Sequence, residues 1–250
     1  MNGIPWLTVL TTPRRPQYLQ RTLVELDCAG AAELAAAGRL LRWIAVDGDP
    51  EQISAPPGWV KVQVGDGLDG TRRAMLHTIQ HAADGQAPYL LYFEDDVIAS
   101  RNAVAAFAAL AVPDECGFVT AFEVQHFHGA DVAPMLTTHR TAALKRTQGG
   151  FWGNQALKLP AGALQHLQLA KVAPGDPPNS SDVWLGEQLA GPGGYREVFG
   201  VINPSLFQHV GAASAVDASW TLAPWRVAAN WAASRNALDV VAAIEKRAPF

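Results

Sequence analysis

The first half of the chain contains short apolar runs rich in β-branched and aromatic residues, separated by turn residues and by segments of helical periodicity. Such runs are typical of buried strands. We therefore predict strands at 6–11, 43–46, 60–64, 89–93 and 117–122.

Between these runs, apolar residues recur at the spacing of one helix face, as Leu19, Leu23 and Leu26 do. Pro16 suits the first turn of that helix and Gly30 its end. Three more helices are predicted at 31–41, at 71–83 and at 100–110, the last with Ser100 as its N-cap. Alternating strands and helices predict an α/β fold with a mostly parallel twisted sheet and helices on both faces.

The second half is less regular, with helices expected near 160–169, 181–189 and 237–247. No internal repeat or clean linker interrupts the chain. A single domain covering 1–250 is the simpler interpretation, with parts at 1–122, 123–215 and 216–250.

Composition limits the classes of function. The chain has 250 residues, 49% hydrophobic and 17% charged, with a net charge of −4. A globular core is expected, and a nucleic-acid-binding role is disfavoured.

No apolar run approaches the roughly 20 residues of a membrane span. The N-terminus has no signal-peptide pattern, and Cys28 and Cys116 form no disulfide framework. We expect a cytoplasmic protein, with peripheral contact at the inner membrane left open.

Three consecutive carboxylates, Glu94, Asp95 and Asp96, follow the apolar run at 89–93 directly. Adjacent carboxylates repel, and their desolvation is costly unless a cation or hydrogen-bond donors compensate. In an extended chain Asp95 faces away from the other two. A hard cation such as Mg²⁺ or Mn²⁺ binds carboxylates and phosphates together, and α/β ligand sites lie at strand ends. These residues favour a metal-assisted site for a nucleoside diphosphate over a solvated acidic turn.

Arg72 and Arg73 occupy the first turn of a predicted helix, where the helix dipole disfavours cations. An anion bound at that helix end would account for them. Pairing with Asp66 or Asp69 at the surface is an equally good interpretation.

Asp47 follows the second predicted strand and Thr11 ends the first, so both should lie at the same edge of the sheet. Asp47 could accept a hydrogen bond from a base or a ribose. An Asx turn with Gly48 explains it at least as well.

Asp182 begins a predicted helix near its buried face and could serve as a general base, although a favourable first-turn charge is the simpler interpretation. His209 could bind Mn²⁺, but a lone histidine in an apolar stretch is more often structural. His126 and His128 have no evident third ligand and are expected at the rim of a site. Ser205 lacks the GxSxG context of a hydrolase.

Three segments together resemble one family: Tyr92–Val97, Gly149–Gly153 and Asn203–Gly211. The chain resembles GT-A fold glycosyltransferases that use nucleotide sugars, and more narrowly the N-acetylglucosaminyltransferase IV type, in a compact bacterial form. The resemblance extends from about Thr8 to Ser214. It implies that 1–122 binds the nucleotide sugar and that 123–215 binds the acceptor. Residues 216–250 lie outside the resemblance and are expected to form a C-terminal helical tail.

The resemblance also implies a role for each candidate residue. Asp96 and His209 would bind Mn²⁺ or Mg²⁺, and Asp182 would deprotonate the acceptor. The nucleotide sugar would be contacted by the remaining candidates: Thr11, Asp47, Arg72, Arg73, Glu94, Asp95, Gly150 and Trp152.

The expected function is therefore metal-dependent transfer of a sugar, with inversion, from a UDP-linked donor such as UDP-GlcNAc to a glycan or glycolipid acceptor. A bacterial surface-polysaccharide precursor suits a chain without the membrane anchor of animal members. Two alternatives stay open. A sugar nucleotidyltransferase normally has a glycine-rich loop after the first strand, and Thr11–Arg15 has no glycine. A non-catalytic carbohydrate-binding protein would use the eight tryptophans for stacking on sugars.

Overall fold

The protein is described here by a computed structural model. The model describes residues 3–13, 16–67, 70–122, 143–147, 151, 153–172, 181–210, 231 and 236–246.

One eight-stranded sheet organises this part of the chain, in the order β3-β2-β1-β4-β8-β6-β9-β7. Four of its seven neighbouring pairs are parallel: β1 with β2, β1 with β4, β2 with β3, and β6 with β9. Its strands are β1 Trp6–Thr11, β2 Leu41–Asp47, β3 Trp59–Gly65, β4 Tyr89–Glu94, β6 Cys116–Thr120, β7 Ala143–Thr147, β8 Ala156–Pro160 and β9 Val198–Asn203. A separate antiparallel pair joins β5, Val97–Ala99, to β10, Phe207–His209.

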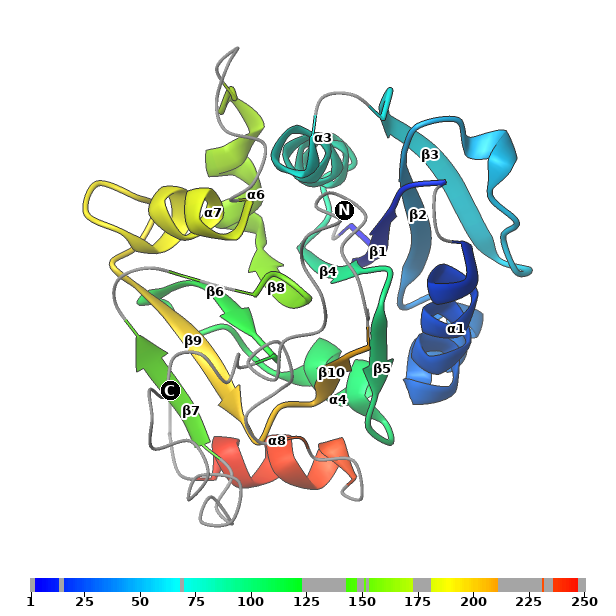
Figure 1. Ribbon diagram of the computed structural model, residues 1–250. Helices are drawn as coiled ribbons and strands as arrows, with labels where there is room; N and C mark the ends of the chain where they lie inside the picture. The colour runs from blue at the N-terminus through cyan, green and yellow to red at the C-terminus, as the bar shows by residue number, and fades with distance from the viewer. Residues whose placement is uncertain are drawn as a thin grey trace.

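Helices cover both faces of the sheet (Figure 1). On one face lie α3 Thr71–Asp84, α6 Ala161–Gln168 and α7 Ser181–Ala190. On the other lie α1 Pro16–Leu26, α4 Ala103–Ala109 and α8 Ala237–Glu245. Two short segments complete the helices: α2 Ala32–Ala36, which follows a π-helical turn at Asp27–Ala31, and a 3₁₀ turn at Pro50–Gln52. The predicted α/β fold class, with a mostly parallel sheet and helices on both faces, is confirmed.

Strand β4 shows why the apolar runs form central strands. Leu91 and Phe93 belong to the core under α1 and α4, while Leu90 and Tyr92 belong to the core under α3 and α7. Because successive side chains of a strand point to opposite faces, a strand covered on both sides must be apolar throughout.

Two predicted helix boundaries are wrong. The helix expected at 31–41 stops at Ala36, since Gly38 adopts a left-handed conformation (φ 66°) and Leu41 already belongs to β2. Ser100 does not cap α4, whose N-cap is Asn102. The Ser100 hydroxyl instead donates to the carbonyl of Leu206 at 2.9 Å, which ties the start of α4 to the segment before β10.

The end of β4 also differs from the expectation of an extended acidic segment. The strand stops at Glu94, and Asp95 and Asp96 form a turn before β5 begins at Val97. The alternation of side-chain faces expected for an extended chain therefore does not apply to Asp95 and Asp96.

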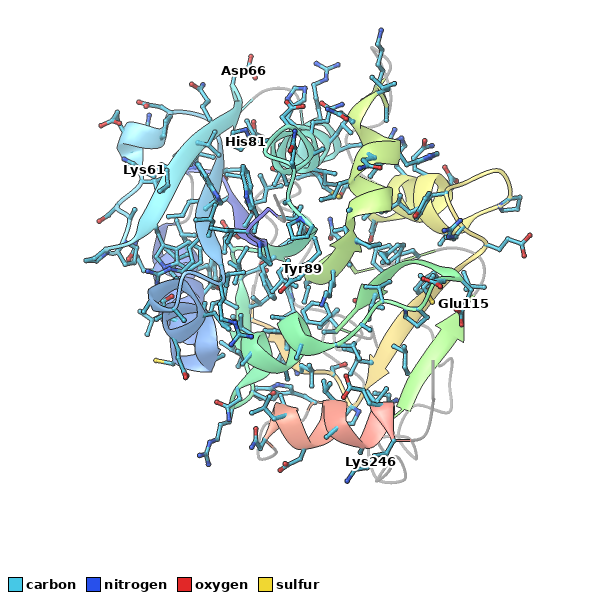
Figure 2. The ribbon with its side chains drawn as sticks, turned by 180° about the vertical axis from the view of Figure 1, so that it is seen from behind. Lys61, Asp66, His81, Tyr89, Glu115 and Lys246 are labelled. Carbon is cyan, nitrogen blue, oxygen red and sulfur yellow. The ribbon has the colours of Figure 1, made fainter. Side chains whose placement is uncertain are left out.

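Lys158 on β8 is buried and closes the end of α4. Its ammonium donates to the carbonyls of Phe107 and Ala108 at 3.1 and 2.8 Å and to that of Leu110, and it lies 4.2 Å from the centre of the Tyr89 ring. Burial lowers the pKa of Lys158 from 10.5 to about 8. Tyr89, at the start of β4, lies near the centre of the view in Figure 2. A cation at a helix C-terminus suits the helix dipole.

Within the described residues, no helix is both long enough and apolar enough to span a bilayer.

Candidate active site at the carboxyl edge of the sheet

The carboxyl ends of β1, β2 and β4 meet at one edge of the sheet. In the parallel ladders Leu10 is paired with Glu94, and Thr11 with Val46, the residue before Asp47. The candidates that end these strands therefore lie in adjacent positions, as the sequence predicted. Ligands of α/β proteins usually bind at this edge.

Asp95 is fixed by partners from two other elements. The Thr11 hydroxyl donates to Asp95 Oδ2 at 2.5 Å. The Thr22 hydroxyl, from α1, donates at 2.8 Å to the Asp95 carbonyl and accepts at 3.1 Å from the amide of Val97. These bonds hold the backbone of the acidic turn, so the direction of each carboxylate is set by the fold.

Asp96 and His209 come together although 113 residues separate them in the chain. Nε2 of His209 lies 3.0 Å from Asp96 Oδ2. The antiparallel pairing of β5 with β10 places His209 opposite Val97, and the amide of Val210 donates to the Asp96 carbonyl at 2.8 Å. The two residues assigned to the metal by resemblance are thus direct neighbours.

This pair fits a divalent cation in two respects. Asp96 Oδ2 and His209 Nε2 lie 3.0 Å apart, the length of a direct hydrogen bond, and this spacing also equals the roughly 3.0 Å between adjacent octahedral ligands at about 2.1 Å from a cation. In addition, Asp96 Oδ1 is buried and has no hydrogen-bond partner in the described part of the chain. Among the described residues no group of three histidine, cysteine or acidic side chains could bind a metal. A cation here would therefore take its other ligands from phosphate and water, as Mg²⁺ commonly does.

Asp47 is buried at the end of β2, and its carboxylate is oriented by the backbone of the next loop. Oδ1 accepts from the amide of Gly67 at 2.9 Å. The amide of Gly48 bonds to the Gly65 carbonyl at 3.2 Å, which joins the end of β2 to the end of β3. A Cβ at Gly65 would collide with Asp47 Oδ1, and glycine at 65 is thus required for this arrangement.

Arg72 and Arg73 lie in the first turn of α3, directly after the loop that follows β3. The Arg72 side chain is buried, with 8% of its surface exposed, whereas Arg73 is half-buried. Burial of a guanidinium needs compensating negative charge. The structure therefore distinguishes the two arginines by their burial, which the sequence could not do.

Asp182 lies in the first turn of α7, where its carboxylate accepts two backbone hydrogen bonds. Oδ1 accepts from the amide of Val183 at 2.9 Å, and Oδ2 accepts from Gly153 at 3.0 Å. Two residues further along, Gln155 donates from Nε2 to Glu94 Oε2 at 3.2 Å. Asp182 and Glu94 are therefore linked through one short segment, 153–155, which brings α7 to the edge formed by β4.

Four buried side-chain atoms at this edge have no hydrogen-bond partner among the described residues: the Tyr92 hydroxyl, Asp96 Oδ1, Gln155 Oε1 and His209 Nδ1. Buried polar groups are nearly always bonded, and exceptions usually mark a missing ligand, water or ion. Similar atoms lie elsewhere among the described residues, on Trp43 and His81 for example, so those of Asp96 and His209 support a binding site only together with the contact between these two residues.

Gly150 and Trp152 lie outside the described residues, as do His126 and His128. The sequence interpretation missed Thr22, Gln155 and Tyr92. Thr22 and Gln155 act through contacts between distant segments. Tyr92 has a local signal, because it lies two residues before Glu94 and so shares a strand face with it.

Comparisons with known proteins identify no family for this chain and find a distant structural likeness. No family model matches the chain, and no curated protein matches it. Among solved structures, it is similar to the apo form of the glycosyltransferase GlyE of Streptococcus pneumoniae TIGR4, with 11% sequence identity and a TM-score of 0.38. The alignment covers 63% of this chain and 34% of that one, so the chain spans about a third of the length of that protein. A likeness at this level establishes neither a family nor a function, and the function has to be inferred from the site.

Proposed function

We propose that the protein is a metal-dependent glycosyltransferase that transfers a sugar from a UDP-linked donor to a hydroxyl of a glycan acceptor. The observation that carries the proposal is the contact of Asp96 with His209 beside the acidic turn. Around it, Thr11, Asp47 and Asp95 end or follow neighbouring parallel strands. This arrangement offers oxygen and nitrogen ligands next to the edge where nucleotides bind in α/β folds.

Asp96 and His209 would hold the cation, and Mn²⁺ or Mg²⁺ there would neutralise the diphosphate as it leaves. Arg72 lies at the start of α3, where a positive helix end adds to its charge. It would bear part of the negative charge of the phosphates. Thr11, Asp47 and Asp95 would contact the nucleoside and ribose, with Arg73, Glu94, Gly150 and Trp152 as further donor contacts.

Asp182 would act as the general base. The acceptor oxygen attacks the anomeric carbon while the bond from that carbon to the diphosphate oxygen breaks. The hydroxyl proton passes to the Asp182 carboxylate. A single displacement of this kind inverts the anomeric configuration. The two amide bonds to Asp182 orient its carboxylate, as the positioning of a general base requires.

The finer assignment rests on the resemblance to the N-acetylglucosaminyltransferase IV type. It supports UDP-GlcNAc as the first donor to test. A precursor of a bacterial surface polysaccharide is the proposed acceptor class, and the proposed location is the cytoplasm, with peripheral contact at the inner membrane.

The mechanism is tested with the variant Asp182→Asn. Release of UDP from a panel of UDP-sugars, with Mn²⁺ and an acceptor mixture, should fall by about 100-fold or more in this variant. Glu187→Gln is the matched control, since Glu187 is exposed on the same helix and should leave the rate unchanged. Substantial transfer by Asp182→Asn would show that Asp182 is not the base.

The same assay separates the alternatives. A binding protein would bind UDP-sugars without releasing UDP, and a nucleotidyltransferase would form pyrophosphate from UTP and a sugar phosphate. Either result would replace the proposed transfer reaction.

A further inference from the structure

The Tyr92 hydroxyl is a polar group that the fold leaves buried and without a partner. Tyr92 is fully buried in the middle of β4, on the face covered by α3 and α7. Among the described residues its hydroxyl has no hydrogen-bond acceptor. Phenylalanine would fill the same volume without this cost, so packing does not explain a tyrosine at this position.

A series of contacts connects the surroundings of Tyr92 to Asp182. Tyr92 and Glu94 share a strand face, and Glu94 is bonded to Gln155 at 3.2 Å. Two residues before Gln155, the amide of Gly153 donates to Asp182 at 3.0 Å. On the helix itself, Trp184 and Leu185 pack in the same core cluster as Tyr92. Helix α7 and the Tyr92 side chain therefore lie on the same face of the sheet, where α7 packs against β6, β9 and α3.

Electrostatics keep this hydroxyl protonated. The pKa of Tyr92 is raised well above its ordinary value, first by burial and then by the negative charges of four carboxylates: Glu94, Asp95, Asp96 and Asp182. A neutral hydroxyl in that field turns its proton toward the negative groups, and it is then a hydrogen-bond donor directed at the site.

We infer that Tyr92 is a positioning residue whose hydroxyl donates, directly or through one water, to the Asp182 carboxylate when substrates are bound. Each oxygen of Asp182 already accepts one amide and retains capacity for another donor. The added bond stabilises the charged form of the carboxylate and fixes its orientation toward the acceptor. This inference rests on the proposed role of Asp182 as the base.

The test is the variant Tyr92→Phe, with Tyr89→Phe as matched control. Tyr89 carries its hydroxyl at the other end of the same strand, on the opposite face. We expect Tyr92→Phe to lower kcat about tenfold or more and to leave Tm unchanged or higher, because the lost hydroxyl had no partner. The acid limb of the pH profile should move to higher pH, since the carboxylate loses a donor that favoured its ionised form.

A double-mutant cycle assigns the effect to Asp182. If Tyr92 acts through this carboxylate, Tyr92→Phe should cause no further loss of kcat in the Asp182→Asn background. Unchanged kcat and pH profile in Tyr92→Phe, a lower Tm with normal kcat, or losses that add with Asp182→Asn would each overturn the inference. None of these results affects nucleotide binding by the wild type, so a failure here is distinct from a failure of the proposed function.

Discussion

Each candidate side chain at the sheet edge is oriented by a partner from a distant part of the chain. Asp95 accepts from Thr11, 84 residues earlier, and Asp96 contacts His209, 113 residues later. Such partners fix Asp95 Oδ2 and Asp96 Oδ2 against two different elements, β1 and β10. At the scale of single residues, the site is thus a set of fixed oxygen and nitrogen atoms around one acidic turn.

Gly65 makes room for Asp47, and this requirement gives a prediction. In Gly65→Ala, the new methyl group would displace the Asp47 carboxylate and break its bond to the Gly67 amide. We expect the affinity for UDP to fall by about 10- to 150-fold, since one buried charged hydrogen bond is worth roughly 1.5–3 kcal/mol. Isothermal titration calorimetry with UDP in the presence of Mn²⁺ measures the change in affinity.

The variant Asp47→Ala serves as the comparison. If Gly65→Ala acts only through Asp47, the two single variants and the double variant should weaken UDP binding by similar factors. Wild-type affinity in Gly65→Ala would show that the Asp47 carboxylate does not contact the nucleotide.

At the scale of elements, the corner between β4 and β5 is the part of the fold that forms the site. Thr22 of α1 bonds to the backbone on both sides of the acidic turn. The pairing of β5 with β10 then brings His209 to Asp96. A helix on one face of the sheet and a short strand pair together hold the turn in place.

Replacement of Thr22 by valine should weaken this corner. Thr22→Val keeps the shape of the side chain but leaves the buried amide of Val97 without its acceptor. We expect a loss of about 1–3 kcal/mol in the free energy of unfolding, measured in urea, with weaker UDP binding. Thr78→Val is the control, because the Thr78 hydroxyl bonds only to a carbonyl within its own helix, and it should cost less than about 1 kcal/mol. Equal losses in both variants would contradict a special role of Thr22.

The elements also show what the sequence could predict. The long apolar runs at 6–11 and 89–93 are strands because a central strand is covered on both faces. An uninterrupted run of this kind is visible in the local sequence. Strand β8 was missed, since its five residues include the buried Lys158, whose charge is compensated by carbonyls at the end of α4. Pairing partners of this kind are set by the tertiary fold.

The residues of the candidate site likewise divide into those that the local sequence places and those that only the tertiary fold places. Residues that end predicted strands, such as Thr11 and Asp47, were placed at one edge by topology alone. His209 was placed near Asp96 only through a resemblance, because nothing local in the sequence links the two. Tyr92 lies in an apolar run, where its spacing from Glu94 is a weak local signal, and its buried hydroxyl without a partner in the described part of the chain adds the stronger one.

At the scale of the whole molecule, both halves of the chain build one sheet. Strand β8 lies between β4 and β6, so residues after 150 are inserted beside the central strands of the first half. As a result, Asp182 and His209 of the second half lie near the sheet edge that is formed by strands of the first 122 residues. This interleaving brings α7 and the ends of β1, β2 and β4 into one domain, as the proposed base and the proposed nucleotide site require.

The central claim is that Asp96 and His209 bind a cation that in turn binds a nucleoside diphosphate. The most direct measurement is thermal unfolding of the protein with UDP, with Mn²⁺ or EDTA, for the wild type and Asp96→Asn. The exposed Asp114→Asn is the control. Ligand at 100 times its Kd stabilises the folded state by about 2.7 kcal/mol. We predict that UDP raises Tm only with Mn²⁺, in the wild type and in Asp114→Asn but not in Asp96→Asn. A Tm that UDP does not change, or changes equally with EDTA or in Asp96→Asn, would contradict the account.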